Sequence, residues 1–384
     1  MGNPKIRFKG FTKDWEQRKF SDIAARESSI STSTTDVPSV EYEDVIAEEG
    51  RLNKDIHLKE AVKSGITFDG SQVLYGKLRP YLHNWLNPDF KGIAVGDWWV
   101  LKPINMDKKF LYRLIQTQQF DNIANLSSGS KMPRADWNLI SNSEFMVPFS
   151  KEEQSKIGRY FDSLDHLITL HQRKCEQTKK LKKYMLQKMF PQNGAKVPEI
   201  RFDGFTYDWE QRKFGEVFQE YSEKNHPELP ALTIIQGGGT VLREESDRNL
   251  QYNKSSLSGY KMVCENDFIV HLRSFEGGLE KSNHKGLISP AYHTFHGDNV
   301  DSRFYYPYFR SYEFIKHKLV PHVYGIRDGR SIDIDGMKTI EIPYTSYEEQ
   351  KKIGDYIQSL DHLITLHQRQ TDFYKKNSFY YISS

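Results

Sequence analysis

The chain has 384 residues, 27% of them charged, and its formal net charge of +3 leaves acids and bases nearly balanced. This length suits two or three domains, and the balance permits a local basic patch for nucleic acid without requiring one. The two cysteines, Cys175 and Cys264, lack the spacing of a disulfide framework or a zinc site, and no run of about 18 apolar residues could span a membrane, so we expect a soluble protein of the reducing cytoplasm.

The first element along the chain is a phrase that returns in the second half. Residues 6–20 read IRFKGFTKDWEQRKF and residues 200–214 read IRFDGFTYDWEQRKF, with 13 of 15 positions identical. A second pair of segments, residues 152–173 and 348–369, agrees at 18 of 22 positions. The two repeats have nearly the same offset, 194 and 196 residues. The chain is therefore a tandem duplication of a unit in which a globular part is followed by a helix.

Between the repeated segments the two halves have diverged, and each reads as mixed structure. Short β-rich runs at 72–75, 98–101, 267–272 and 339–342 are separated by turn residues, whereas 110–120 and 304–314 are predicted to be short helices. The glycine run at 237–239 has no lysine to meet a phosphate, and we interpret it as a turn. Each half therefore predicts one α+β domain.

The segments at 152–173 and 348–369 have the apolar spacing of a coiled-coil seam, alternately four and three residues. The predicted seam residues are Ile157, Phe161, Leu164 and Ile168 in the first copy and Ile353, Ile357, Leu360 and Ile364 in the second. One helix cannot bury a seam alone, so we predict that the two helices pack as an antiparallel intramolecular coiled coil. The fold class that follows is α+β, with two similar globular domains separated by this helix pair in a pseudo-two-fold tandem repeat.

Each predicted helix begins at a capping box, Ser150 with Glu153 and Ser346 with Glu349. Further leucines at 167, 170, 363 and 366 widen the apolar stripe, and they are explained equally well by ordinary core and by a second contact. After Arg369 the second copy loses the pattern of the first. The sequence leaves open whether the second helix is shorter.

Basic residues that recur in loops of both halves are the candidate DNA-binding residues. They are Lys77, Arg79, Lys131 and Arg134 in the first half and Arg273, Arg327 and Arg330 in the second. An arginine fork matches the edge of guanine, and lysines meet phosphates. Any one of these residues is explained as well by plain surface charge, and the two arginines of the first loop pair, Arg79 and Arg273, could instead pin a turn.

Motifs for catalysis are missing from the sequence. There is no GxxxxGK[ST] phosphate loop, and His293 with His296 has no third ligand at a telling spacing, so no metal site is predicted. We also find no nucleophile, base and orienting group that could form an enzyme site. The chain is therefore expected to be non-catalytic and to bind no cofactor itself.

On several motifs the whole chain resembles the specificity subunit of type I restriction-modification systems. They are the phrase at 14–18 and its copy at 208–212, the Gly-x-Lys-x-x-Arg stretch at 129–134, and the Glu-Glu-Gln-x-Lys-Ile-Gly starts at 152 and 348. The resemblance implies a first target-recognition domain at 1–150, a first conserved helical spacer at 151–190 and a linker at 191–198. A second target-recognition domain at 199–345 and a second conserved helical region at 346–384 follow.

The resemblance also implies the function and the partners. Each domain would read one half of a bipartite target in double-stranded DNA, and two modification subunits would dock on the chain and methylate adenine N6. Restriction subunits, which are translocase and nuclease in one, would complete the complex. S-adenosylmethionine, ATP and Mg would come with these partner subunits.

Two other classes of function remain as alternatives. The chain could be a stand-alone DNA methyltransferase or nuclease, which would bind its own cofactor. It could also be a two-domain scaffold that binds protein rather than DNA. Binding to duplex DNA that weakens steeply with salt would argue against such a scaffold, because phosphate neutralisation releases counterions.

Overall fold

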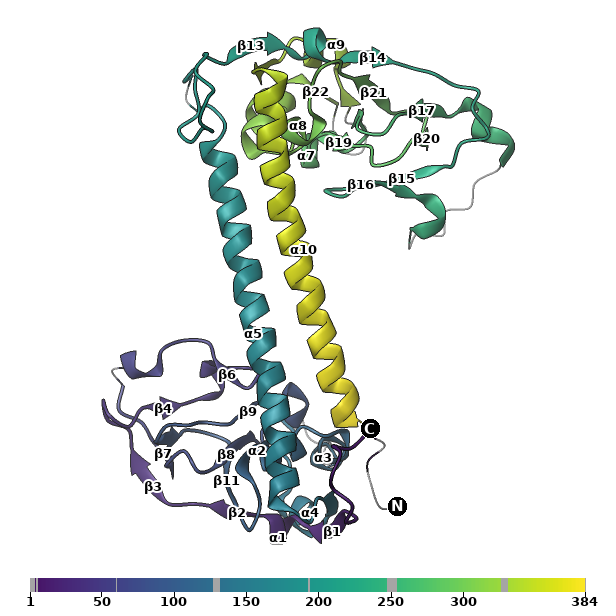
Figure 1. Ribbon diagram of the computed structural model, residues 1–384. Coiled ribbons are helices and arrows are strands. Elements are labelled where there is room, and N and C mark those ends of the chain that lie inside the picture. The colour runs from purple at the N-terminus through teal and green to yellow at the C-terminus, as the bar shows by residue number, and fades with distance from the viewer. Residues whose placement is uncertain are drawn as a thin grey trace. The chain divides into compact units, whose positions relative to one another are not determined.

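The computed structural model describes residues 4, 6–59, 61–126, 132–192, 194–246, 254–325 and 331–383, with the side chains of 254–256 and 379–383 excepted. The chain divides into two compact units, Met1–Arg173 with Gln368–Ser384, and Lys174–His367. Each unit contains one globular domain and a stretch of each of two long helices (Figure 1).

The first domain is built on two four-stranded sheets and a two-stranded ribbon. One sheet has the order β2-β11-β8-β9, formed by Ala24–Glu27, Trp98–Pro103, Val73–Gly76 and Trp85–Leu86. The other has the order β3-β7-β10-β4, formed by Ile30–Thr32, Ser64–Phe68, Gly92–Ala94 and Ser39–Val40. The ribbon pairs β1 (Glu16–Lys19) with β12 (Glu144–Val147), so the repeated phrase closes onto the last strand before the long helix. Smaller elements are η1 (Tyr42–Asp44), β5 (Val45–Ile46), β6 (Arg51–Leu52), η2 (Ile56–Leu58) and η3 (Pro80–Leu82).

The second domain repeats this plan. Its four-stranded sheet has the order β14-β21-β18-β19, formed by Gln219–Tyr221, His293–His296, Phe268–Val270 and Glu280–Lys281. Its ribbon pairs β13 (Glu210–Lys213) with β24 (Glu341–Tyr344). The remaining pairs are β17 (Lys261–Val263) with β20 (Gly286–Ile288), β15 (Leu232–Ile235) with β16 (Gly239–Leu242), and β22 (Val323–Tyr324) with β23 (Ser331–Ile332). Two short 3-10 helices, η4 (Arg243–Glu245) and η5 (Lys254–Gly259), follow β16. The sheet β14-β21-β18-β19 and the ribbon thus repeat the sheet β2-β11-β8-β9 and the ribbon of the first domain, whereas the described residues of the second domain form two-stranded pairs in place of the sheet β3-β7-β10-β4.

Short helices lie between the strands in both domains. In the first they are α1 (Phe20–Ile23), α2 (Lys108–Leu114), α3 (Gln118–Ala124) and α4 (Trp137–Asn142). In the second they are α6 (Phe214–Val217), α7 (Ser274–Gly277), α8 (Ser302–Phe309), η6 (Glu313–Leu319), η7 (Val320–His322) and α9 (Ile334–Lys338). The helix predicted at 110–120 is broken in two, because the Thr117 side chain accepts a hydrogen bond from Phe120 N at 3.3 Å and starts a new helix. The segment at 304–314 is likewise divided between α8 and the π-helical η6.

Aromatic residues of the repeat occupy matching core positions. Phe20 and Phe120 are fully buried with ring centroids 5.4 Å apart, and Phe214 and Phe314 are fully buried in the second core. The partners that surround them differ between the halves, since β8 and β11 supply Tyr75 and Trp99 to the first core. The repeat therefore preserves a frame of aromatic positions around which the diverged residues repack.

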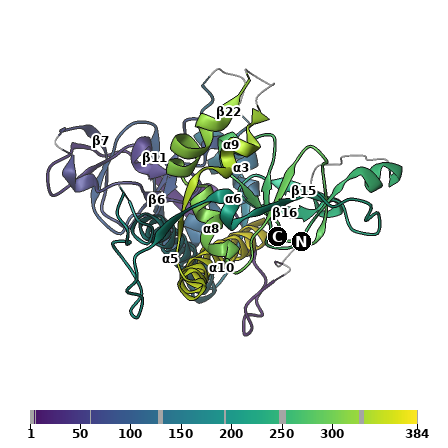
Figure 2. The ribbon, with the colours of Figure 1, turned by 90° about the horizontal axis from the view of Figure 1, so that it is seen from above.

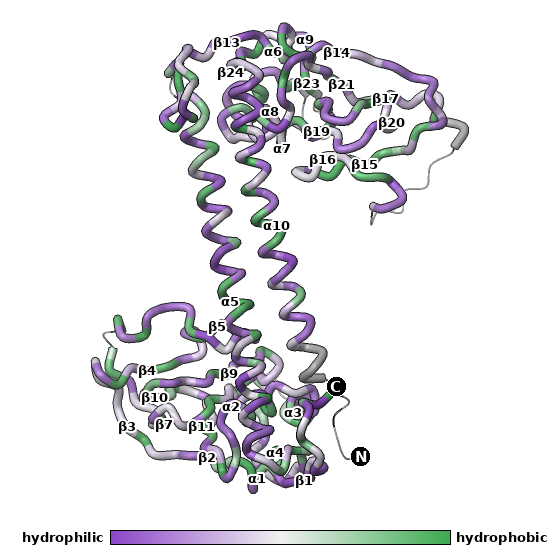
Figure 3. Tube along the Cα trace, viewed as in Figure 1, coloured by the Kyte–Doolittle hydropathy of each residue, from purple (hydrophilic) through white to green (hydrophobic). Residues whose placement is uncertain are grey.

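The two long helices are α5 (Lys151–Lys188) and α10 (Tyr347–Ser383), of 38 and 37 residues. Their hydropathy alternates along the chain, as Figure 3 shows by colour. In the first unit the rings of His171 and Tyr374 stack with centroids 5.8 Å apart. In the second unit Lys182 Nζ lies 2.5 Å from Asp361 Oδ1. Going along α5 from His171 to Lys182, the contacting residue on α10 goes back from Tyr374 to Asp361, so the two helices are antiparallel. The predicted α+β fold with an intramolecular helix pair is confirmed.

The second long helix is not cut short. After Arg369 it continues as a regular helix to Ser383, although the sequence pattern of the first copy is lost there. Among the helices of the described residues, none is both long and apolar enough to cross a membrane.

The predicted seam residues pack partly on their own domains. Ile353 and Ile357 belong to the core of the second domain, and Ile157 packs on the core of the first. The other predicted seam residues divide by burial: Phe161, Leu164 and Leu360 are buried, and Ile168 and Ile364 are half-buried. The apolar stripe thus serves the junction between helix and domain at the start of each helix.

The second glutamate of each Glu-Glu-Gln start is a buried anchor rather than half of a capping box. Glu349 is fully buried and accepts hydrogen bonds from Arg201 Nε at 2.7 Å, from Arg201 Nη2 at 2.8 Å and from Trp209 Nε1 at 3.1 Å. Glu153 binds the corresponding residues of the first repeat, Arg7 and Trp15, in the same way. The serine half of the predicted capping box forms in the second helix, where Ser346 Oγ accepts Glu349 N at 3.3 Å. The glutamate half does not form among these described residues, because the arginine guanidinium binds the carboxylate.

The glutamine of each Glu-Glu-Gln start fixes the helix to a second element. Gln154 Oε1 accepts Asp107 N at 2.9 Å, immediately before α2, and its Nε2 donates to Pro148 O at 2.8 Å. Gln350 makes the equivalent bonds, accepting Asp301 N before α8 at 3.0 Å and donating to Thr345 O, two residues before α10, at 2.8 Å. Each long helix therefore starts at a defined place on its own domain.

Candidate nucleic-acid interface

The structure brings together three of the predicted basic residues of the first domain. Leu78 and Arg134 form an antiparallel bridge, and Arg79 N donates to Pro133 O at 2.7 Å. The loop that follows β8 is thereby joined to the segment before α4. Lys77, Arg79 and Arg134 consequently share one exposed region, although they are 57 residues apart at the extremes (134 − 77).

Asp97 partly neutralises the positive charge of this region. Its carboxylate accepts Arg134 Nη2 at 3.0 Å and Nε at 3.3 Å, and Lys77 Nζ lies 3.5 Å away. The hydrogen bond from Arg134 lowers the pKa of Asp97, and the same bond raises the pKa of Arg134. The Arg134 side chain is still 52% exposed.

Among the described residues, Arg79 forms no ion pair, whereas Lys77 and Arg134 both pair with Asp97. Arg79 is exposed, has a left-handed φ of +49°, and its guanidinium makes no hydrogen bond within the described part of the chain. Its backbone, rather than its side chain, pins the turn through the bond to Pro133. The fourth predicted residue, Lys131, lies outside the described residues.

In the second domain the aligned loop has another shape. Arg273 is exposed and stands directly before α7, and its N–H lies 3.3 Å from His271 Nδ1. Within the described residues its guanidinium makes no hydrogen bond. Arg327 and Arg330 lie outside the described residues. The repeat therefore places a basic loop after the same strand in both domains, β8 and β18, but shapes each loop differently.

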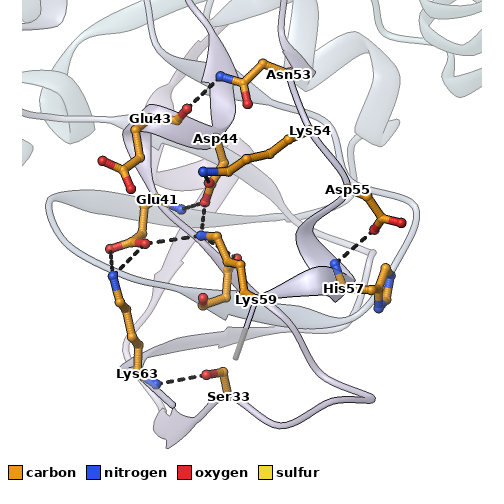
Figure 4. A network of polar contacts seen from close by, with 11 residues as sticks. Ser33, Glu41, Glu43, Asp44, Asn53, Lys54, Asp55, His57, Lys59 and Lys63 are labelled. Atoms are coloured by element: carbon orange, nitrogen blue, oxygen red, sulfur yellow. Dashed lines mark hydrogen bonds and ion pairs between the residues drawn. The ribbon is translucent and has the colours of Figure 1, made fainter. Parts of the chain in front are cut away.

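A lysine-rich loop of the first domain was missed from the sequence (Figure 4). Lys54 Nζ lies 2.9 Å from Asp44 Oδ1, Lys59 also binds Asp44, and Lys63 Nζ lies 2.6 Å from Glu41 Oε1. Burial acts to raise the pKa of Asp44, but hydrogen bonds from Lys59 and Lys54 outweigh it and lower that pKa.

This network ties the loop after β6 to η1 and leaves Lys54 47% exposed. The signal in the sequence was three lysines following two acids. The second half has no counterpart of these lysines, so the internal repeat does not mark them as site residues.

Comparison with known proteins finds relatives of this chain among DNA specificity proteins. Residues 12–180 match the family model of the type I restriction modification DNA specificity domain. The type I restriction enzyme MjaVIII specificity subunit of Methanocaldococcus jannaschii is 24% identical over 292 residues, which cover 71% of this chain and 67% of that protein. Residues 12–180 are therefore a type I restriction-modification DNA specificity domain, and the chain is similar to type I specificity subunits. The matched residues cover most of the first repeat unit, and the second unit carries the same motifs.

Two solved structures share the fold of this chain over nearly its whole length. The type I restriction-modification S subunit from M. genitalium aligns with a TM-score of 0.59 at 12% identity, covering 99% of this chain and 97% of that one. A chain of a type I R-M system, described for its complex assembly and conformational transition, aligns with a TM-score of 0.50 at 16% identity, covering 99% and 98%. At such identities the likeness concerns the fold.

Proposed function

We propose that the chain is the DNA-recognising subunit of a type I restriction-modification complex and that each domain reads one half of a bipartite duplex target. The observation that supports this proposal is one four-stranded sheet order, with one closing ribbon, that occurs in both domains with different loops. The loop around Arg79 is bridged to Pro133, whereas the aligned loop around Arg273 leads into α7. Two domains that share a sheet but differ in their loops suit two different half-sites, because side chains on the loops would contact the base edges.

The long helices would set the spacing between the half-sites. Glu153 and Gln154 fix the start of α5 to the first domain, and Glu349 and Gln350 fix the start of α10 to the second. Helical residues between these anchors rise 1.5 Å each. The number of unread base pairs would then follow from helix length rather than from base contacts.

The partners in this proposal are two modification subunits, one for each repeat, which methylate adenine N6, and the restriction subunits of the full complex. Leu363 and Leu366 support a docking role, because they are 41% and 39% exposed on α10 and offer an apolar face. The chain itself would have no catalytic activity. S-adenosylmethionine, ATP and Mg would enter with the partner subunits.

A domain exchange tests the proposal. Residues 20–150 would be replaced by the same segment of another family member, and methylated sites would be mapped with purified modification subunits. We expect one half-site to change while the other half-site and the spacer stay. A change in both half-sites, or methylation in the absence of this chain, would contradict the proposal.

A further inference from the structure

The hairpin β15–β16 of the second domain ends in an exposed tip formed by Gln236, Gly237 and Gly238. Gly237 and Gly239 have left-handed φ angles of +82° and +75°. A Cβ at Gly239 would lie 2.5 Å from Lys281 O, so no larger residue fits there. Glycines make such a tip flexible, and a two-stranded hairpin is marginally stable alone.

Side chains from β19 and from the turn after it hold this tip in one conformation. Glu280 is fully buried, and its carboxylate accepts the N–H groups of Gly237 at 2.7 Å and Gly239 at 3.1 Å. Asn283 Nδ2 donates to Gly238 O at 2.8 Å and to Thr240 O at 3.1 Å. Two N–H groups and two carbonyl groups of the backbone at this tip are therefore bound by side chains.

The carboxylate of Glu280 is itself held on its other side. Tyr306 OH donates to Glu280 Oε2 at 2.7 Å. Arg310 Nη1 forms an ion pair with Glu280 Oε1. A buried carboxylate is costly unless it is paired and hydrogen-bonded. Removing a donor would thus loosen the carboxylate, and the tip with it.

The tip lies beside the basic loop of the second domain. A Cβ built at Gly277 would be 2.2 Å from Gln236 Nε2, so the Gln236 amide rests on α7. The residue before α7 is the exposed Arg273. In the view from above, β15 and β16 lie to the side of α8 (Figure 2). One edge of this domain thus presents the Gln236 amide on α7, and the residue that precedes α7 is the exposed Arg273.

We propose that Gln236 is a specificity-determining residue of the second domain, which reads the edge of an adenine, and that Glu280 is its positioning residue. This inference rests on the proposed DNA recognition. A glutamine amide can donate to N7 and accept from N6 of adenine in the major groove only in its two-bond geometry, with the amide nitrogen on N7 and the oxygen on N6. Two neighbouring glycines let the backbone approach the groove closely. Because the clasp fixes the tip in advance, less conformational entropy is lost on binding.

The experiment uses the full chain in complex with purified modification subunits and a library of randomised duplexes, from which bound sequences are selected and read. In the Gln236→Ala variant, preference should fall by about 5- to 150-fold at one base pair of one half-site. Preferences elsewhere should stay. The matched control is Gln219→Ala, an exposed glutamine on β14 of the same domain, which should leave the selected sequence unchanged.

The positioning role is tested by Glu280→Gln and by Tyr306→Phe, which removes one donor to the carboxylate and keeps the ring. Both should relax the same base pair as Gln236→Ala and no other, a result that a general loss of stability would not give. If Glu280→Gln fails to fold in a thermal melt, Tyr306→Phe decides. An unchanged sequence for Gln236→Ala, or equal weakening at every position, would overturn the inference. A wild-type complex without sequence preference would instead refute the proposed function.

Discussion

Replacement of Glu349 by alanine tests how the long helix is fixed to its domain. Four hydrogen bonds meet this fully buried carboxylate, two from Arg201, one from Trp209 and one from Thr345. The variant leaves the Arg201 side chain, which is only 14% exposed, without its counter-charge. Breaking a buried pair by removing one partner costs about 3 to 5 kcal/mol.

The size of the unit converts this cost into a temperature. For a unit of this length, about 1 kcal/mol corresponds to roughly 2 to 4 °C, so Tm should fall by about 6 to 20 °C. The control is Glu348→Ala, the preceding glutamate, which is exposed in the same first turn. It loses only a favourable interaction with the helix dipole, of about 1 kcal/mol or less.

Differential scanning calorimetry of both variants and the wild type measures the effect. The account predicts a large loss for Glu349→Ala and a small one for Glu348→Ala. Equal effects of the two substitutions would show that the buried carboxylate does not anchor the helix, and the reasoning would be refuted.

Three further predictions concern the rest of the chain. The hydrogen bond to Asp267 raises the pKa of His296 in the folded protein. The stability that protonated His296 adds is therefore complete below the unfolded pKa of about 6.5 and is lost as the pH rises through the folded pKa. The variant His296→Gln should show a smaller fall in Tm over this pH range. Gly158→Ala should lower the free energy of unfolding, measured in urea, more than Gly354→Ala, because the new Cβ would lie 2.5 Å from Lys109 Cβ and close to backbone, against 3.1 Å from a side-chain oxygen at Gly354. Arg79→Ala should weaken binding to duplex DNA and lower the salt slope by about one if it meets a phosphate, measured by fluorescence anisotropy; full affinity would remove Arg79 from the interface.

The duplication and the helix pair were predictable because they are written as near-identical segments with regular apolar spacing. The roles of individual polar residues were not. Ser150 and Glu153 have the local spacing of a capping box, but the carboxylate binds Arg7 and Trp15, which precede it by 146 and 138 residues. Local patterns cannot reveal such distant partners.

The same limit applies to the candidate interface. The glycines at 237–239 read correctly as a turn, yet nothing near them in the sequence indicates that Glu280 binds two of their N–H groups. Lys77 and Arg79 were found because the repeat marks their loop. The lysines around Asp44 were missed because the second half has no matching residues.

The central proposal is that two similar DNA-reading domains are spaced by the pair of long helices. An insertion of equal length in both helices tests it most directly. One heptad would be added to each helix, after Thr178 in α5 and after His362 in α10, which keeps the seam in phase and lengthens each helix by about 10 Å. Methylated sites mapped with the partner subunits should then show the same two half-sites with a spacer longer by about three base pairs, at 3.4 Å along a strand. An unchanged spacer, with both half-sites intact, would contradict the account.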